Sequence, residues 1–546
     1  MATALPDDIL HLLCEELARQ ECFDTLFNCA CSSKSLAVPA LTHLYRSHHL
    51  APVRNGGEDE AVILPTKQLV VQRWSILWRS IIASSMNATL FPYCRYIRIL
   101  DFRDLENLLE DDQFKGKVMK QFFSAPLDQV YKKQSKTFGN PSRQHVRLDV
   151  PAIIDAIGEV VTQHTPMLDT ISGELLSHAL VRWAPRLPRL QTLELKNGSP
   201  LEDELVHASI YEHCPQFNSL SIYTWTADER DHKLASFIGT VQPQSLRLIE
   251  TFRDIGAGAE TFLALNSHSE TLKDLRLCVS SDSLPHLSLL RSCTALEAVR
   301  LEDSDGLTNL EKTQNDVFLE IVDWLRKCES LRRLSFSGFQ SAASIVGRVM
   351  LEDKIKLRKL EIDSYLLKEH QLFHQALVNQ RASLRFLSLS GDADGMFRDD
   401  VDILVDSLKQ LAGLRVLKLL DFHEIFSDDH LIFIIDSLSL LEDIYVTGVE
   451  IKDGVLESAG RLENLRNVAF AGISKFTTDG LLEFISLLGP GNQGIRVMID
   501  MADPATLLTE TEIVLVKQSL WEKVGGVLDY VPYKDPDISE FEGDSD

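Results

Sequence analysis

The sequence lacks the long apolar runs and the N-terminal features that membrane or secreted proteins carry. Its longest apolar stretches, such as residues 431–435, are far shorter than the roughly 18 residues that span a bilayer. Asp7 and Asp8 stand where a secretion signal would need a positive region and an apolar core. We therefore expect no membrane contact and a location in the cytoplasm, the nucleus or both.

Cysteine is also sparse, and its pattern argues against disulfides and metal sites. The nine cysteines are scattered, odd in number and without a CxxC pair, so reduced thiols are expected. Cys214, Cys293 and Cys328 each precede by three residues the first apolar position of a recurring phrase described below. No His or Cys recurs beside them at ligand spacing. They are predicted to be small buried spacers, and no metal or other cofactor is expected.

Basic charge is in deficit over the chain as a whole. The 80 acidic residues outnumber the 55 Lys and Arg residues, which gives a formal net charge of −25. This balance argues against general nucleic-acid binding and against attraction to anionic membranes. One stretch departs from it, because residues 113–147 hold eight Lys or Arg residues and one Asp. That stretch is predicted to be a basic, irregular insertion that proteases cleave early.

Catalytic constellations are missing as well. No Ser/His/Asp or Cys/His set presents itself, and the glycine pair Gly256 and Gly258 lacks the third glycine of a dinucleotide site. His370 and His374 share a helix face at a spacing that zinc could use, but no third ligand can be identified. The sequence therefore predicts a chain without enzymatic activity of its own.

What the sequence does contain is an internal repeat. Phrases of the form L-x-x-L-x-L recur with a mean spacing of about 28 residues, within the roughly 20–29 residues of leucine-rich repeats. Each phrase reads as a strand, and helical apolar spacing follows it, as in residues 316–328. The phrases begin at Leu190, Phe217, Leu246, Leu272, Leu296, Leu331, Leu357, Leu384, Leu414, Leu441, Leu465 and Ile495.

This alternation predicts an α/β leucine-rich-repeat solenoid, a horseshoe with parallel strands inside and helices outside. We expect the solenoid to span residues 91–528, with the basic insertion at about 103–150. A linker and a connecting helix would occupy residues 51–90. Residues 529–546 carry seven acids and one lysine, so an acidic disordered tail is expected there.

Residues 1–50 are predicted to form a separate, small helical domain. Its first helix opens at Leu5-Pro6-Asp7-Asp8, with proline at a favoured opening position and two acids suited to the helix dipole. Ile9 and Leu13 lie on one helical stripe, and a second apolar segment follows from Leu26. So small a unit cannot enclose this much apolar surface, so a partner is expected to cover some of it.

The segment LPDDILHLLCEEL, followed by LFNCACSSKSLAVPALTHLYRSHHL, resembles the F-box, and its pairing with repeats is similar to F-box/leucine-rich-repeat substrate receptors of the fungal type. The resemblance implies that the N-terminal domain docks on a Skp-family adaptor and, through it, on a cullin, while the repeats hold a protein substrate. The adaptor contacts that it implies are Leu5, Pro6, Ile9, Leu10, Leu13 and Leu26. An ordinary helical cap for the solenoid, on a scaffold without a ligase, is the alternative.

Substrate would then bind on the concave sheet. Side chains alternate along a strand, so the residues between the repeated apolar positions project from the core. Stacking should align them in columns, which in sequence order run through Glu194, Ser221, Glu250, Arg276, Arg300, Ser335, Glu361, Ser388, Lys418 and Tyr445. Aromatic and arginine side chains carry most interface energy, so the predicted anchors are Tyr223, Trp225, Arg276, Arg300, Arg333 and Tyr445.

Overall fold

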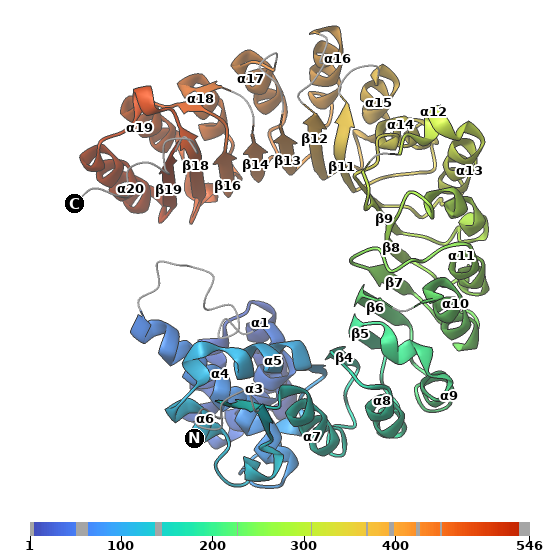
Figure 1. Cartoon of the computed structure of the whole chain (residues 1–546). Helices are drawn as coiled ribbons and strands as arrows, with labels where there is room; N and C mark the ends of the chain where they lie inside the picture. Colours follow the sequence, from blue (N-terminus) through green and yellow to red (C-terminus); the bar gives the residue numbers. More distant parts are fainter. Residues whose placement is uncertain are drawn as a thin grey trace. The chain divides into compact units, whose positions relative to one another are not determined.

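The structure, a computed structural model, consists of two compact units, Met1–Thr271 and Leu272–Asp546 (Figure 1). The residues that it describes are 5–50, 64–136, 145–226, 228–306, 308–366, 370–392, 398–421, 426–447 and 450–533. The linker residues 51–63 and the acidic residues 534–546 lie outside them. No helix in the described part of the chain is both long and apolar enough to cross a bilayer.

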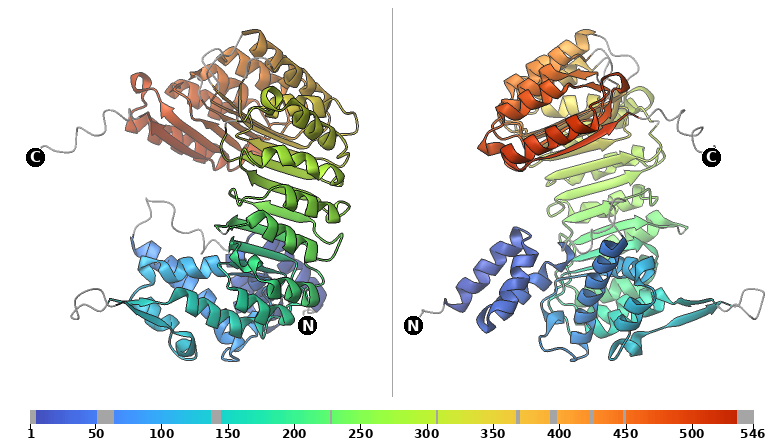
Figure 2. Two further views of the ribbon diagram at one scale, coloured as in Figure 1. Left: turned by 45° about the vertical axis from the view of Figure 1, so that its right-hand side comes forward. Right: turned by 90° about the vertical axis from the view of Figure 1, so that its left-hand side faces the viewer.

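The first unit begins with three short helices that pack on one another. They are α1 (Asp7–Arg19), α2 (Phe23–Ser32) and α3 (Lys34–Arg46). Their shared core contains Cys14, Ala18, Leu26 and Ala40, all buried. Ser33 ends α2 and caps α3, because its hydroxyl accepts a hydrogen bond from the backbone N–H of Leu36 at 3.2 Å. Figure 2 shows these helices in dark blue at the start of the chain.

The long helix α4 (Leu64–Ser85) organises the next part of this unit. Trp74 and Trp78 both donate their indole N–H groups to the buried carboxylate of Asp104, at 3.0 and 2.7 Å. Arg79 donates to the backbone carbonyls of Ser124 and Ala125 at 2.9 and 2.8 Å. Through these contacts, the segment that follows the first strand of the sheet packs on α4.

That segment includes most of the predicted basic insertion, and it is folded. It contains α5 (Phe102–Glu110), η3 (Asp112–Phe114), α6 (Lys117–Phe122) and η4 (Leu127–Val130). The prediction of an irregular stretch is therefore wrong over residues 113–130. Its physical reason is that apolar residues alternate with the lysines and are buried: Phe114, Val118, Phe122, Leu127 and Val130.

An antiparallel hairpin completes the inserted segment. Its strands are β2 (Lys133–Lys136) and β3 (His145–Leu148), with Gln134 opposite Arg147. Both views of Figure 2 show it projecting from the rest of the unit. Residues 137–144 between the strands, part of the predicted irregular insertion, lie outside the described residues.

The sheet of the first unit is parallel and carries helices on one side. Its strands are β1 (Ile99–Asp101), β4 (Thr170–Gly173), β5 (Thr192–Asn197), β6 (Ser219–Thr224) and β7 (Leu248–Thr251). The outer helices are α7 (Val150–Thr162), α8 (Ser177–Trp183), α9 (Glu204–His213), α10 (Arg230–Thr240) and α11 (Ala259–Leu265). Equivalent leucines meet across strands, as Leu193 and Leu220 do. Repeated apolar positions thus form one continuous core.

The second unit repeats this architecture. Its main parallel strands are β8 (Asp274–Val279), β9 (Ala298–Asp303), β10 (Arg333–Ser337), β11 (Lys359–Leu366), β12 (Phe386–Asp392), β13 (Val416–Leu420), β14 (Asp443–Val446), β16 (Asn467–Phe470), β18 (Arg496–Ala502) and β19 (Val527–Pro532). The short strands β15 (Ile451–Lys452) and β17 (Ser474–Lys475) pair with each other beyond the ends of the main strands.

Helices again cover one face of the second unit. They are α12 (Leu310–Thr313), α13 (Asn315–Arg326), α14 (Ala342–Met350), α15 (Gln371–Ala376), α16 (Arg398–Leu408), α17 (Asp428–Ser437), α18 (Asp453–Gly460), α19 (Thr478–Leu487) and α20 (Glu510–Val524). Between β8 and β9 the 3-10 helix η8 (Leu284–Ser292) takes this place. Both units have the fold of an α/β leucine-rich-repeat solenoid.

The C-terminal limit of the repeats differs from the prediction. The solenoid was expected to end at residue 528, but β19 continues to Pro532 and pairs in parallel with β18, with Ile499 opposite Tyr530. The boundary was misplaced because Asp529 begins the acidic stretch, although it sits on the outward side of a strand. Leu528 faces inward and is buried.

The three cysteines that precede repeat phrases are buried spacers, as predicted. Cys214, Cys293 and Cys328 are at most 3% exposed. Burial raises the pKa of each thiol to about 12. The carbonyl of Cys293 accepts a hydrogen bond from the indole of Trp324 at 3.1 Å, so the spacer also joins neighbouring repeats.

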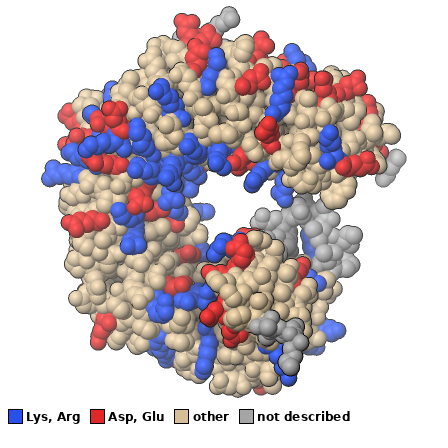
Figure 3. Space-filling view, turned by 180° about the vertical axis from the view of Figure 1, so that it is seen from behind, with Lys and Arg blue, Asp and Glu red and all other residues tan. Residues whose placement is uncertain are grey.

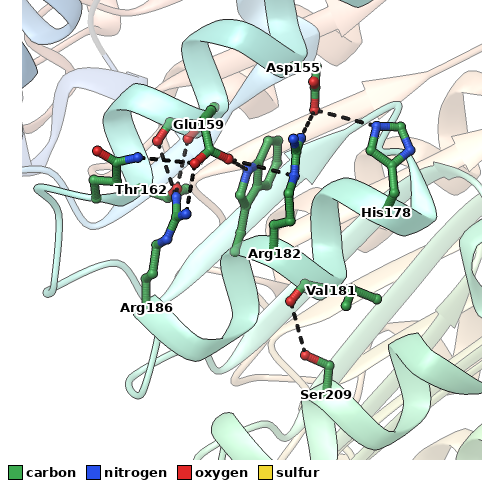
Figure 4. A network of polar contacts seen from close by, with 11 residues as sticks. Asp155, Glu159, Thr162, His178, Val181, Arg182, Arg186 and Ser209 are labelled. Atoms are coloured by element: carbon green, nitrogen blue, oxygen red, sulfur yellow. Dashed lines mark hydrogen bonds and ion pairs between the residues drawn. The ribbon is translucent and has the colours of Figure 1, made fainter.

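Ion pairs connect the outer helices α7 and α8 (Figure 4). Arg182 contacts Asp155 at 2.7 Å, and Arg186 contacts Glu159 at the same distance. The indole of Trp183 also donates to Glu159, at 3.3 Å. The hydrogen bond from Arg186 holds the pKa of Glu159 below its usual value. The Glu159 carboxylate on α7 thus contacts three residues of the next outer helical segment, Arg182, Trp183 and Arg186.

We predict that Asp104→Ala lowers the free energy of unfolding by about 2–5 kcal/mol, because two indole N–H groups lose their acceptor inside the protein. The same change should expose residues 112–130 to protease. Thermal denaturation and limited proteolysis would measure both effects. The exposed Asp128→Ala serves as the matched control and should change neither. Wild-type stability and cleavage in Asp104→Ala would contradict the described packing of this segment on α4.

We predict that Glu159→Gln costs about 1 kcal/mol of stability near neutral pH. The folded pKa of Glu159 lies below the unfolded value, so its ion pair stabilises the fold above about pH 4.5. That contribution is lost as the pH falls through the folded pKa, and the difference between the two proteins should then disappear. Urea denaturation at about pH 7 and about pH 3.5 measures it.

The control is Glu457→Gln, which removes an exposed ion pair with Arg461 within one helical region and should cost well under about 1 kcal/mol. An equal loss for Glu159→Gln at both pH values would show that the side chain acts through packing, not through charge.

Candidate interaction surfaces

Large apolar side chains lie exposed along one side of α1 and just before its first residue. Leu5, Ile9, Leu12 and Leu13 are between 46% and 60% exposed, and they recur at helical spacing. We call these four residues the α1 strip. The opposite side of the helix, with Leu10, Cys14 and Ala18, faces the core of the three-helix group. On α2, Phe27 is also 58% exposed.

The structure divides the predicted adaptor residues into two groups. Leu5, Pro6, Ile9 and Leu13 are on the surface. Leu10 and Leu26 are in the interior, with 6% and 0% exposure, so their prediction as direct contacts is corrected. Both sides of α1 are apolar, and the sequence alone does not reveal which of them packs inward. Leu12 and Phe27 are exposed residues that the prediction missed.

On the strand face of the first unit, Arg103 of α5 bridges side chains from several strands. Its guanidinium donates to Asp101 at 3.1 Å, to Glu194 at 2.6 Å and to the hydroxyl of Tyr223 at 2.5 Å. The Tyr223 ring stacks on Phe252 with a centroid distance of 4.0 Å. Burial alone would lower the pKa of Arg103, but Asp101 and Glu194 raise it above its usual value. Tyr223 therefore lies on the predicted face, but its hydroxyl and ring already contact Arg103 and Phe252.

Trp225 was predicted to be a substrate anchor, and that prediction is wrong. It is 2% exposed, and its indole donates to Glu202 at 3.2 Å. The ring packs so closely on Gly198 that a Cβ there would lie 2.4 Å from it. Trp225 follows the last residue of β6, Thr224. The alternation of side chains along a strand therefore no longer predicts whether its side chain points into the core or away from it.

The column predicted from the repeats is confirmed by strand register within each unit. In the first unit Glu194 pairs with Ser221 and Ser221 with Glu250. In the second unit the column runs through Arg276, Arg300, Ser335, Glu361, Ser388, Lys418 and Tyr445. These positions follow from the period of the leucines alone.

Basic side chains gather on the second unit's part of this surface. Arg276 and Arg300 are cross-strand neighbours, and Arg333 and Lys359 form a second such pair one pleat away. The side chains of Arg300 and Arg333 are more than half exposed. Together with Asp274 and the small residue Ala298 these cations line a shallow concavity of about 240 Å³. Figure 3 shows Lys and Arg gathered at the left, where β8 to β11 lie.

One carboxylate orients two of these arginines. Asp274, which is 8% exposed, accepts two hydrogen bonds from Arg276 at 2.9 Å. It also accepts one from Arg333 at 3.2 Å, across the small side chain of Ala298. The Arg300 guanidinium lies 3.8 Å from Glu302, beyond normal hydrogen-bond reach.

Two lysines extend the basic surface to the next strands. Lys359 and Lys418 lie over the ring of Phe386, at 4.5 and 5.6 Å from its centroid. Lys359 also contacts Glu361 at 3.1 Å. Tyr445, a predicted anchor, is partly exposed beside Lys418 in the register. We call the set Arg276, Arg300, Arg333, Lys359 and Lys418 the basic face.

A second hollow in this unit has the opposite charge. Its volume is about 1290 Å³, and it lies among loops that follow β13 to β18. Burial raises the pKa of Asp428, whereas a hydrogen bond from Lys475 lowers that of Glu450. Sequence reasoning missed this hollow because its charged lining residues come from different repeats: Asp421, Asp428, Asp429, Glu450, Lys452, Lys475 and Asp503. Within the described residues no group of three or more His, Cys, Asp or Glu could hold a metal ion.

Comparison with known proteins yields similarity of fold only. No family model matches the chain, and no curated protein matches it. Among solved structures, an internalin from Listeria monocytogenes has 13% identity and a TM-score of 0.34, over 61% of this chain and 81% of its own. The yeast Rad7 and Elc1 complex has 15% identity and a TM-score of 0.35, over 56% of this chain and 81% of its own. The TLR13–ssRNA13 complex has 13% identity and a TM-score of 0.33, over 65% of this chain and 42% of its own.

At such low identities and TM-scores these matches carry no argument about partners or chemistry. The class of the protein rests on its own strands and helices, which make it a leucine-rich-repeat protein. Leucine-rich-repeat surfaces are suited to binding other proteins because they present long rows of side chains.

Proposed function

We propose that this chain is the substrate-recruiting subunit of a Skp–cullin–F-box ubiquitin ligase. The three N-terminal helices would dock on a Skp-family adaptor and, through it, on a cullin. The repeats would hold a protein substrate, and the chain itself would catalyse no reaction. The observation that carries this proposal is the α1 strip, on a helix whose sequence resembles the opening of the F-box.

The α1 strip is apolar surface that a partner would cover. Three large apolar side chains on one side of α1, with Leu5 just before the helix, exceed what a small domain ordinarily leaves in water. The helix already buries its other side, so the strip contributes nothing to the domain's own core. Covering the remaining area of each side chain would contribute about 1 kcal/mol to binding. An adaptor that presents an apolar groove supplies such a cover.

A leucine-rich-repeat scaffold without a ligase is the alternative function. One observation favours it: Ser33, Lys34 and Ser35 are exposed and polar, where the F-box pattern has a large aromatic residue. On this alternative the α1 strip would bind a different helical partner, and no adaptor or cullin would be recovered with the protein.

We predict that Ile9→Ala with Leu13→Ala weakens binding to a purified Skp-type adaptor by about 10–100-fold, because about 1 kcal/mol of burial is lost at each position. Both residues are about half exposed, so the fold should be unchanged. Isothermal titration calorimetry measures the affinity, and circular dichroism checks the helices.

The matched control is Leu69→Ala with Ile76→Ala, which removes exposed apolar side chains from α4 and should leave adaptor binding intact. Absence of adaptor binding by the wild-type chain would favour the scaffold. Undiminished binding by the α1 variant would show that the adaptor uses another surface.

A further inference from the structure

The basic face is an unusual surface on this acidic chain, and its side chains are arranged in a grid. Arg276 and Arg300 occupy one row of the sheet, and Arg333 and Lys359 occupy the row two residues earlier. Neighbouring strands in a sheet lie about 4.8 Å apart. Adjacent cations in each row are therefore close enough for one extended segment to contact both rows.

The acids nearby do not cancel this surface. Asp274 is nearly buried, and its two oxygens are used by Arg276 and Arg333. Its effect is to hold both guanidinium groups in place above Ala298, so they lose less freedom when they bind an anion. Glu361 lies against Lys359, while Glu302 is 3.8 Å from Arg300. Among the three arginines, Arg300 thus has the longest ion-pair distance, and its side chain is 57% exposed.

The geometry of these side chains also favours anionic groups carried on an extended chain. An arginine fork accepts a carboxylate or a phosphate with two parallel hydrogen bonds, and adjacent forks fit such groups placed along one strand. The partly exposed ring of Phe386, with Lys359 and Lys418 over it, adds an apolar contact at the end of the grid. A free anion would use one fork, whereas a peptide can use several at once.

We propose that the basic face binds an acidic segment of the substrate protein in extended conformation, with Asp or Glu carboxylates on Arg300 and Arg333. This inference deepens the proposed function and rests on it, because only a ligase receptor would make the bound protein a substrate. Nucleic acid is the less favoured ligand, because its continuous phosphate charge would extend beyond the basic face onto a chain with a net charge of −25.

Direct binding to the full chain tests the proposal without any adaptor. The probes are a fluorescein-labelled 12-residue peptide with Glu at alternate positions, its Glu→Gln counterpart, and a labelled oligouridine of equal length. Fluorescence anisotropy should show binding of the Glu peptide that is at least about tenfold tighter than that of the Gln peptide, and weaker as salt rises. Absence of Glu-peptide binding, equal binding of the Gln peptide or tighter binding of oligouridine would overturn the proposal.

Paired variants locate the site. Arg300→Gln with Arg333→Gln should weaken Glu-peptide binding at least about tenfold. Arg326→Gln with Arg461→Gln removes the same charge from side chains of similar exposure on the outer helices and should have little effect. Equal losses in the two double variants would mean that overall charge, and not the basic face, governs binding. Adaptor affinity is measured separately, so failure here and failure of the proposed function can be distinguished.

Asp274→Asn separates positioning from net charge. It removes one negative charge, so a purely electrostatic surface would bind the Glu peptide more tightly. If Asp274 positions Arg276 and Arg333, binding should instead weaken by about threefold or more, with an unchanged salt dependence. Thermal denaturation would confirm that the variant is folded, and tighter binding by folded Asp274→Asn would refute the positioning role.

Discussion

The structure depends on one constraint: a single repeat cannot enclose its own apolar face. Each L-x-x-L-x-L phrase therefore packs against the phrases beside it, as Leu193 does against Leu220 in the first unit and Leu334 against Leu360 in the second. Fixing the leucines also fixes the register of the strands. The residues between the leucines then form rows on the opposite face, and the interaction surfaces inherit their spacing from the core.

This constraint explains why some features could be predicted from the sequence. The column from Arg276 to Tyr445 follows from the period of the leucines, and the buried cysteines follow from their constant place before it. The predictions from sequence were wrong where the leucine repeat is interrupted. Trp225 lies just past a strand, and residues 113–130 pack on α4, a helix distant in sequence whose Arg79 donates to the carbonyl of Ser124. The lysines of residues 113–130 suggested a solvated loop, but the apolar residues between them are buried and make the segment fold.

The N-terminal helices show a different limit. Helical spacing predicted an apolar stripe on α1, but two stripes are present, and only packing decides between them. Cys14 and Ala18 are small, so the side that carries them approaches α2 and α3 closely. The bulkier Ile9, Leu12 and Leu13 remain outside. A domain that leaves bulky apolar side chains exposed along one helix is suited to binding through them. The proposed receptor thus combines an apolar surface for its adaptor with a charged surface for its substrate.

The central claim is that these two surfaces are separate and that the adaptor uses the first. Hydrogen–deuterium exchange of the full chain, with and without a purified Skp-type adaptor, tests it most directly. The account predicts added protection in α1 and α2 and unchanged exchange in β8 to β13, which carry the basic face. Protection in β8 to β13, or none in α1, would contradict it.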